Sequence, residues 1–294
     1  MSEDQITEIT KMTELDTLNE YLSKDSPFTK RAFSAGTKKS YIATQKSLSA
    51  LLKTPIHQAS QKRILEVIDS LGFTPATQSS YINIAVIIRN LYGYDVAVLV
   101  KARENNKIAI AESSKITNEK LSLTLPSYED LLDYLNKFYS DENWVSFIIN
   151  FLQINYAVRN EDVTFEIVGF KRDAINPELN YMWFPKIGNK AIWIRNNYKT
   201  VGTYGAQEIE ITDERFLHAV KNVKKKVLVP NLTNVGAFVK SLTLNGIGEG
   251  SIFKILVDHF KTDLQKLKEL SEFRGASLDT IVNSYDLNKK NIKK

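Results

Sequence analysis

Cysteine is absent from the 294 residues of this chain, and histidine occurs only three times. The absence of cysteine excludes disulfide bonds, thiolate zinc sites and cysteine nucleophiles. The histidines, His57, His218 and His259, are scattered and lack the spacing of metal ligands. No window approaches about 18 uninterrupted apolar residues, and the acidic N-terminus has no apolar signal region. We therefore expect a soluble, intracellular protein that does not contact a membrane.

Positive charge is unevenly distributed along the chain. Residues 1–25 hold two lysines against seven acidic residues, a net charge of −5. Residues 26–125 hold fourteen basic against six acidic residues, a net charge of +8, whereas residues 126–294 are nearly neutral with twenty-three against twenty-one. A basic middle segment indicates contact with a polyanion. The solvated face of a helical domain would give the same charge pattern, and composition alone leaves both readings open.

The first hundred residues show helical periodicity throughout. Residues 5–24 place apolar side chains at three- and four-residue steps, which predicts an amphipathic helix with an acidic outer face. We expect this arm, residues 1–25, to dock against a partner or against its own domain. Capping and apolar patterns predict further helices at 38–52, around 64–71 and from 76 to about 92. Residues 26–104 therefore form an all-helical domain in this interpretation.

Basic side chains are frequent in the first half of this helical domain and are interleaved with a tyrosine. Phosphate contacts need only such positive charge, and they contribute affinity rather than sequence choice. The candidate DNA-binding residues are Lys30, Arg31, Lys38, Lys39, Tyr41, Lys46, Lys62 and Arg63.

A polar stretch and a change from helical to strand-like residue patterns divide the chain. Residues 101–124 have few apolar side chains, which predicts the end of a helix and an interdomain linker at 105–125. The second domain, 126–294, combines helices with short strands between 164 and 212 that have turn residues between them. The predicted fold is mainly α with a small antiparallel β-meander, a helical domain followed by an α+β domain.

Individual residues in the second domain are ambiguous when taken alone. Arg159 directly follows a buried apolar helix, where an arginine is unusual without a partner, although it could cap that helix or pair with Asp162. Lys199 lies at the turn of a predicted hairpin, and Tyr285 lies near the C-terminus. By default both are surface residues. The glycines at 246–250 suggest a phosphate-binding loop or a mobile loop, and they lack the Gly-Lys-Ser/Thr end of a P-loop.

Taken in order, these features resemble the tyrosine recombinase (phage-type integrase) family over about residues 26–287. The family has a helix that ends in Thr-Gly-Leu-Arg-x-x-Glu-Leu, and residues 155–163 read Asn-Tyr-Ala-Val-Arg-Asn-Glu-Asp-Val. The family's hairpin lysine matches Lys199. Its tyrosine lies nine residues beyond a Gly-His or Gly-Trp pair, and Gly275-Ala276 stands nine residues before Tyr285 without the histidine or tryptophan.

A second motif departs further from the family pattern. The family has His-x-x-Arg upstream of the tyrosine, where this chain offers Ser251-Ile252-Phe253-Lys254. Lys254 keeps the positive charge of the arginine without its two-pronged geometry. Arg274, two residues before Ala276, is a candidate to restore one donor.

The resemblance implies a core-binding domain, a catalytic domain and a site-specific recombinase or integrase that acts on double-stranded DNA. Tyr285 would attack a phosphodiester to form a 3′-phosphotyrosyl intermediate. Arg159 would neutralise the phosphate, with help from Lys254 and Arg274, and Lys199 would protonate the leaving group. No cofactor is implied.

Partners and location follow from the same resemblance. We expect a tetramer of the chain on DNA, in the cytoplasm or nucleus of a host cell, and an origin in a virus or mobile element. Two alternatives remain: a catalytically inactive relative that binds DNA as an architectural protein, and a helical protein without a nucleic-acid role.

Overall fold

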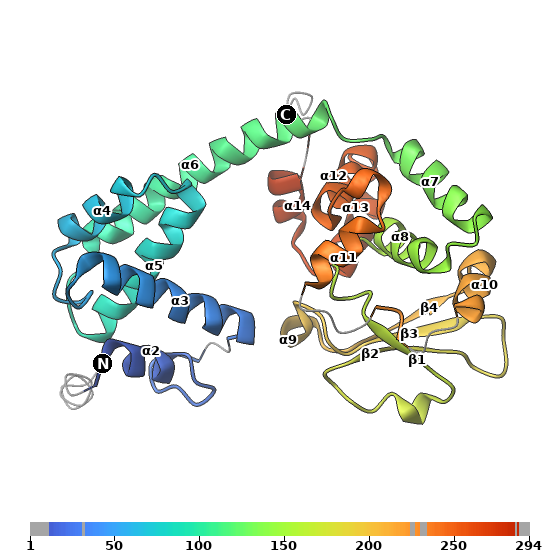
Figure 1. The fold of residues 1–294 in the computed structure, drawn as a ribbon, viewed down its shortest axis with the longest axis horizontal. Coiled ribbons are helices and arrows are strands. Elements are labelled where there is room, and N and C mark those ends of the chain that lie inside the picture. The colour runs from blue at the N-terminus through green and yellow to red at the C-terminus, as the bar shows by residue number, and fades with distance from the viewer. Residues whose placement is uncertain (1–11, 31–32, 224–226, 230–233, 286, 288–294) are drawn as a thin grey trace. The chain divides into compact units, whose positions relative to one another are not determined.

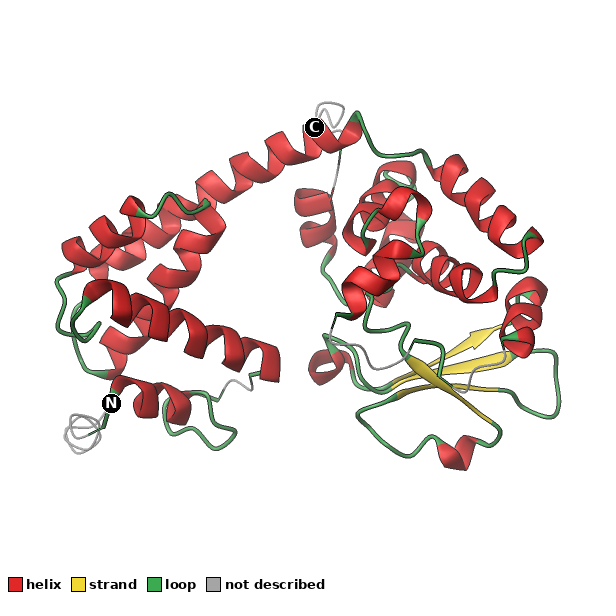
Figure 2. Ribbon diagram, viewed as in Figure 1, coloured by secondary structure: helices red, strands yellow, loops and turns green. Residues whose placement is uncertain are grey.

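The computed structural model describes residues 12–30, 33–223, 227–229, 234–285 and 287. The chain divides into two compact units, residues 1–114 and 115–294 (Figure 1). Helices make up most of both units, and the described strands all belong to the second (Figure 2). The mainly helical class expected from the sequence is confirmed.

The first unit consists of helices around one apolar core. Its N-terminal caps agree with the sequence, because the side chains of Ser34, Ser60 and Thr74 each accept a hydrogen bond from the backbone N–H three residues on. The helices are α2 (Glu14–Tyr21), α3 (Ala35–Leu52), α4 (Gln61–Ser70), α5 (Pro75–Leu91) and the first part of α6 (Ala97–Ser122).

Helix α2 is part of this core rather than a separate arm. Leu18 and Leu22 are buried in the same cluster as Leu48 and Ile88 of α3 and α5. The carboxylate of Glu14 also accepts a hydrogen bond from the backbone N–H of His57 at 2.8 Å. The apolar stripe of α2 is therefore covered by its own unit, one of the two outcomes that its amphipathic pattern allows. Residues 1–11 of the predicted arm lie outside the described residues.

The predicted linker at 105–125 is helical through Ser122, because α6 continues without a break for 26 residues. The segment contains neither glycine nor proline. Its asparagines and serines lower helix propensity by less than about 1 kcal/mol each, which is too little to end a helix. The boundary between the two units falls inside α6, between residues 114 and 115.

The second unit combines helices with a four-stranded sheet. Its helices are α7 (Tyr128–Ser140), α8 (Trp144–Tyr156), α9 (Val201–Tyr204), α10 (Glu214–Asn222), α11 (Val235–Ser241), α12 (Glu249–His259), α13 (Leu264–Arg274) and α14 (Leu278–Tyr285), with 3-10 turns η1 (Lys171–Asp173) and η2 (Leu244–Gly246). Its strands are β1 (Phe165–Val168), β2 (Asn180–Trp183), β3 (Ala191–Arg195) and β4 (Gln207–Ile211), adjacent in that order.

The sheet is mixed, so the prediction of a purely antiparallel meander was wrong for its first pair. Strands β2, β3 and β4 pair antiparallel, but β1 pairs parallel with β2. A parallel pair needs a crossover of about a dozen residues. Residues 169–179, which include η1, supply it. The turn signal at Asn176-Pro177 lies within this crossover rather than between hairpin strands.

The strands alternate between two apolar environments. Met182, Trp193 and Ile211 pack into the main core with the helices, whereas Tyr181 and Ile194 join a small cluster on the opposite face. Figure 1 shows the larger helices of this unit gathered on one side of the sheet. The side chains of β3 at 191, 193 and 195 therefore share the face that meets the helices.

Replacing Leu18 with alanine tests whether α2 is integral to the first unit. We expect Leu18→Ala to lower the free energy of unfolding by about 2–5 kcal/mol, because a fully buried leucine leaves a cavity. Denaturant unfolding measures the change. Asn19→Ala, at an exposed position on the same helix, is the control and should stay within about 0.5 kcal/mol of the original protein. Equal stability of the two variants would contradict the assignment.

Candidate functional site

Arg159, Arg274 and Tyr285 come together in the second unit. Arg159 follows α8, Arg274 ends α13 and Tyr285 ends α14. Burial lowers the pKa of the Arg159 guanidinium and the charge of Arg274 lowers it further, whereas Asp162, Glu249 and Tyr285 act in the opposite direction. Arg159 is therefore within electrostatic reach of both other candidates.

The end of α8 and the end of α13 are fastened to each other by Arg274. Ala157 ends α8 in the left-handed conformation, with φ of 50°, and leaves carbonyl groups without helical partners. Nη1 of Arg274 donates to the carbonyl oxygens of Ala157 at 3.3 Å and Val158 at 3.1 Å. Arg274 is only 4% exposed. It is thus a structural link as well as a candidate site cation.

Glu249 is a site residue that sequence reasoning missed. Its carboxylate accepts a hydrogen bond from Nη2 of Arg274 at 3.0 Å and another from the backbone N–H of Asn160. The glycine-rich segment 246–250 thus contributes an anion to the site through the first residue of α12. No sequence pattern indicated this role, because the flanking glycines predicted a loop.

Several buried polar atoms around this cluster lack a hydrogen-bond partner among the described residues. They include Nη1 of Arg159, Nε of Arg274 and Oγ1 of Thr200. Most buried polar groups in proteins are paired, so an unpaired group requires an explanation. Unpaired guanidinium donors such as those of Arg159 and Arg274 suit an oxyanion with several acceptor oxygens.

Phe253 positions Tyr285 beside the arginines. The ring of Phe253 meets that of Tyr285 edge to face, with 4.7 Å between the centroids and 74° between the planes. The guanidinium carbon of Arg274 lies 4.8 Å from the centroid of the same ring. One aromatic side chain on α12 therefore contacts both the tyrosine and the buried arginine.

Lys199 is exposed in the connection between β3 and β4, on the hairpin that the sequence predicted. The neighbouring residues are firmly held. The backbone of Asn197 exchanges two hydrogen bonds with the side chain of Asn180, at 2.8 and 2.9 Å. The hydroxyl of Tyr198 donates to the carbonyl of Gly205 at 2.7 Å. The lysine therefore extends from a fixed turn.

This turn touches the junction between α13 and α14 at Gly275. Gly275 has a φ of 59°, and a Cβ added to it would lie 2.0 Å from Oγ1 of Thr200, the residue after Lys199. Only glycine fits both the backbone conformation and the contact. The turn that carries Lys199 and the helix that carries Tyr285 thus meet at one residue.

Lys254 points toward a different neighbour. Its Nζ donates to Oδ1 of Asn118, near the end of α6, at 2.5 Å, and burial lowers its pKa. Glu249 and Phe253, one turn apart on the same helix, are the residues of α12 that contact Arg274. Ala276, at the position of the family's histidine or tryptophan, packs against the core.

Asp162 pairs with a second arginine rather than with the Arg159 side chain. Its Oδ2 accepts from the backbone N–H of Arg159 at 2.9 Å and from Nη2 of Arg195 at 2.9 Å. Asp162 is 1% exposed and Arg195 is fully buried. The alternation of buried residues along β3, with Ala191 and Trp193 on the helix-facing side, was the one sequence signal that pointed to Arg195.

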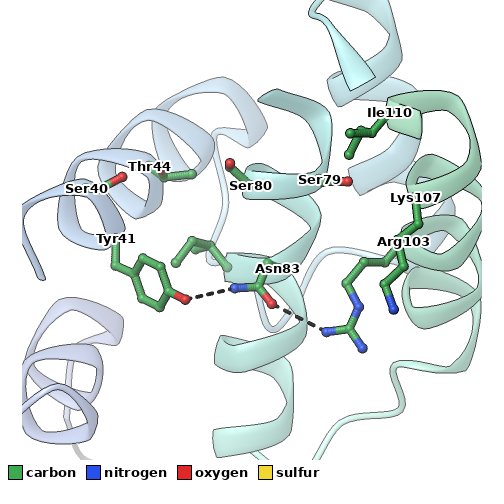
Figure 3. A pocket seen from close by; sticks show the side chains of 10 residues that line it. Ser40, Tyr41, Thr44, Ser79, Ser80, Asn83, Arg103, Lys107 and Ile110 are labelled. Carbon is green, nitrogen blue, oxygen red and sulfur yellow. Dashed lines mark hydrogen bonds between the residues drawn. The ribbon is translucent and has the colours of Figure 1, made fainter. Parts of the chain in front are cut away.

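The candidate DNA-binding residues of the first unit are mostly exposed. Lys38 is half-buried, and Arg31 lies outside the described residues. Lys30, Lys39, Lys46, Lys62 and Arg63 are exposed. Tyr41 is partly buried and lines a hollow of about 350 Å³ between α3, α5 and α6 (Figure 3).

Small polar side chains and two cations surround this hollow. The hydroxyl of Tyr41 accepts a hydrogen bond from Nδ2 of Asn83 at 3.2 Å, and Oδ1 of Asn83 accepts one from Arg103 at 3.4 Å (Figure 3). None of the residues that line the hollow is acidic, but Lys107 is bonded to Glu104, on the same helix, at 2.8 Å. Arg103 and Lys107 were missed by sequence reasoning, which assigned this part of α6 to a helix end and a linker.

No helix in the described part of the chain is long and apolar enough to cross a membrane. No family model, no curated protein and no solved structure matches the chain.

Replacing Gly275 with alanine tests the contact between the Lys199 turn and α14. We expect Gly275→Ala to lower the free energy of unfolding by at least about 2 kcal/mol, because the backbone is strained and Thr200 must move. Adding Thr200→Ala should restore part of this loss, because it removes the nearest atom. Thermal and denaturant unfolding measure both variants.

Gly202→Ala is the matched control. An added Cβ there meets nothing within 4 Å, so no loss of stability is expected. A Gly275→Ala protein as stable as the original would show that the two segments do not touch.

Proposed function

We propose that this chain is a DNA strand transferase of the tyrosine recombinase type, with Tyr285 as its nucleophile. The observation that carries the proposal is the environment of Arg159. This half-buried guanidinium keeps one buried nitrogen without a partner and lies within electrostatic reach of Tyr285 and Arg274. A tyrosine beside an arginine that keeps one donor unpaired is an arrangement that suits attack on a phosphodiester.

The chemistry follows from the charge of the substrate. A phosphodiester repels nucleophiles until its non-bridging oxygens are neutralised. Arg159 supplies a planar fork for this purpose. Arg274 adds positive charge behind it, although two of its nitrogens are already bound to protein oxygens.

The transfer itself exchanges one phosphate ester for another. The Tyr285 oxygen forms a bond to phosphorus and passes its hydroxyl proton to solvent water, and the bond from phosphorus to the 5′-oxygen breaks. Lys199 donates a proton to that leaving oxygen, which departs as a 5′-hydroxyl. Attack by a 5′-hydroxyl on the phosphotyrosine reverses the sequence and rejoins DNA. Lys254 takes part only if its ammonium exchanges Asn118 for the phosphate.

Double-stranded DNA is the proposed substrate. The exposed lysines of the first unit and the cations of the hollow in Figure 3 support contact with its phosphates. Site-specific recombination or integration by a tetramer of this chain on DNA is the process that we propose for it.

A DNA-binding protein without strand-transfer activity is the second candidate. Arg274 and Lys254, which would share the phosphate charge with Arg159, both have protein partners. If these contacts persist on DNA, transition-state stabilisation depends on Arg159 and Lys199 alone. Loss of a single oxyanion donor costs about 10²–10³ in rate in other enzymes.

A nicked suicide duplex distinguishes the two candidates. Incubation followed by a denaturing gel should give a covalent protein–DNA band that is lost in Tyr285→Phe and reduced at least about 10²-fold in Arg159→Ala. Tyr204→Phe, at an exposed position, is the control and should leave the band unchanged. Binding without any covalent band in the original protein would favour the inactive candidate.

Arg103→Ala tests the hollow as part of the DNA-binding surface. We expect weaker binding to all duplex sequences and a decrease of about one in the slope of log affinity against log salt concentration. Fluorescence anisotropy at several salt concentrations measures both. Lys101→Ala is the control, because Lys101 lies two residues earlier and therefore on the opposite side of α6. Equal effects of the two variants would rule out a specific contribution of the hollow.

A further inference from the structure

Three distant parts of the chain must be held in register for the proposed reaction. Arg159 follows α8, Lys199 lies between β3 and β4, and Tyr285 follows the α13–α14 junction. Catalytic groups need positions accurate to about 0.5 Å. One side chain, Arg195, contacts all three parts.

The first contact of Arg195 reaches the segment of Arg159. Nη2 of Arg195 donates to Oδ2 of Asp162 at 2.9 Å, and the same oxygen accepts the backbone N–H of Arg159 at 2.9 Å. A single atom, Oδ2 of Asp162, therefore links the end of β3 to the backbone of Arg159.

The second contact fixes the hairpin of Lys199. Nη1 of Arg195 donates to Oε1 of Gln207, its partner across the β3–β4 ladder, at 2.8 Å. The guanidinium carbon lies 4.4 Å from the centroid of Tyr198, the residue before Lys199. Arg195, which lies in β3, thus contacts β4 through Gln207 and the turn through Tyr198.

The third contact reaches the end of α13. Nη1 of Arg195 also donates to the backbone carbonyl of Phe273 at 3.3 Å. Phe273 directly precedes Arg274 and lies two residues before the glycine that touches Thr200. The same guanidinium is therefore bonded to the helix that leads into α14.

We propose that Arg195 is a positioning residue for strand transfer, which holds the turn of Lys199 in register with Arg159 and the Tyr285 helix. This inference rests on the proposed function. A fully buried ion pair contributes little net stability compared with an apolar replacement, so stability alone is a weak reason for its presence. A planar fork with three separate acceptors is a geometry that lysine does not reproduce.

Arg195→Lys tests the assignment, with Arg172→Lys as the control at an exposed arginine. We expect the Arg195 variant to bind duplex DNA within about twofold of the original protein and to form the covalent adduct about 10²-fold more slowly, because small displacements of catalytic groups cost rate. Single-turnover gels and anisotropy measure the two quantities.

A second substrate separates positioning from a general loss of structure. In a suicide duplex whose bridging 5′-oxygen is replaced by sulfur, the thiolate leaves without a proton, so Lys199 is no longer needed. Adduct formation by Arg195→Lys and by Lys199→Ala should recover at least tenfold on this duplex. Arg159→Ala should not recover, because the phosphate oxygens still need neutralisation.

The outcomes are distinct. An original protein that forms no adduct on either duplex overturns the proposed function and this assignment together. An active original protein with an equally active Arg195→Lys, or with an equal loss on both duplexes, overturns the assignment alone. If Arg195→Lys does not fold, the double variant Asp162→Asn with Arg195→Met removes both charges and is judged by the same two criteria.

Discussion

The buried ion pair between Asp162 and Arg195 is the interaction on which the site depends. Charged groups with 1% and 0% exposure lose their hydration on folding, and they are tolerated only when each finds hydrogen bonds in return. Asp162 and Arg195 find them in the backbone after α8, in β4 and at the end of α13. These hydrogen bonds join segments far apart in the sequence, although Oδ1 of Asp162 and Nε of Arg195 have no partner among the described residues.

The balance of charge around Arg159 has the same origin. Burial and the neighbouring charge of Arg274 both lower the pKa of the Arg159 guanidinium. Glu249 and Asp162 offset this effect, because Glu249 binds Arg274 and Asp162 binds the backbone of Arg159. The Arg159 side chain is left with the incomplete set of partners. Arg159 is therefore the residue of this cluster that would attract an incoming anion most strongly.

Local sequence patterns predicted much of this arrangement. Apolar spacing and capping residues located the helices, and the turn residues located the β3–β4 hairpin with Lys199. The glycine before the last helix proved to be required by both its φ and its contact with Thr200. The order of Arg159, Lys199 and Tyr285 in the sequence also predicted that the three side chains share one site. In the structure, Arg159 and Tyr285 lie within electrostatic reach of each other.

The continuity of α6, the direction of β1 and the contacts of Glu249 and Arg195 could not be predicted from the sequence, for physical reasons. A polar stretch without glycine or proline is compatible with a linker or with a solvated helix, and α6 is the latter. Strand direction depends on how the crossover at 169–179 packs, which local pattern does not encode. Glu249 and Arg195 act through partners far away in the sequence, so their contacts have no local signature, even though the alternation along β3 places Arg195 on the buried face.

Tyr285 is held in place by helix α14, and the arginines beside it are held by other parts of the unit. Within α14, Ile281 is buried, and burial of one isoleucine contributes about 1.5–3 kcal/mol. That is a fraction of the 5–15 kcal/mol that typically stabilises a whole domain. Arg274 is buried and bonded to the end of α8 and to Glu249. Tyr285 lies at the end of a helix of eight residues, and segments near a chain end with few buried contacts open locally at lower free-energy cost than a core does.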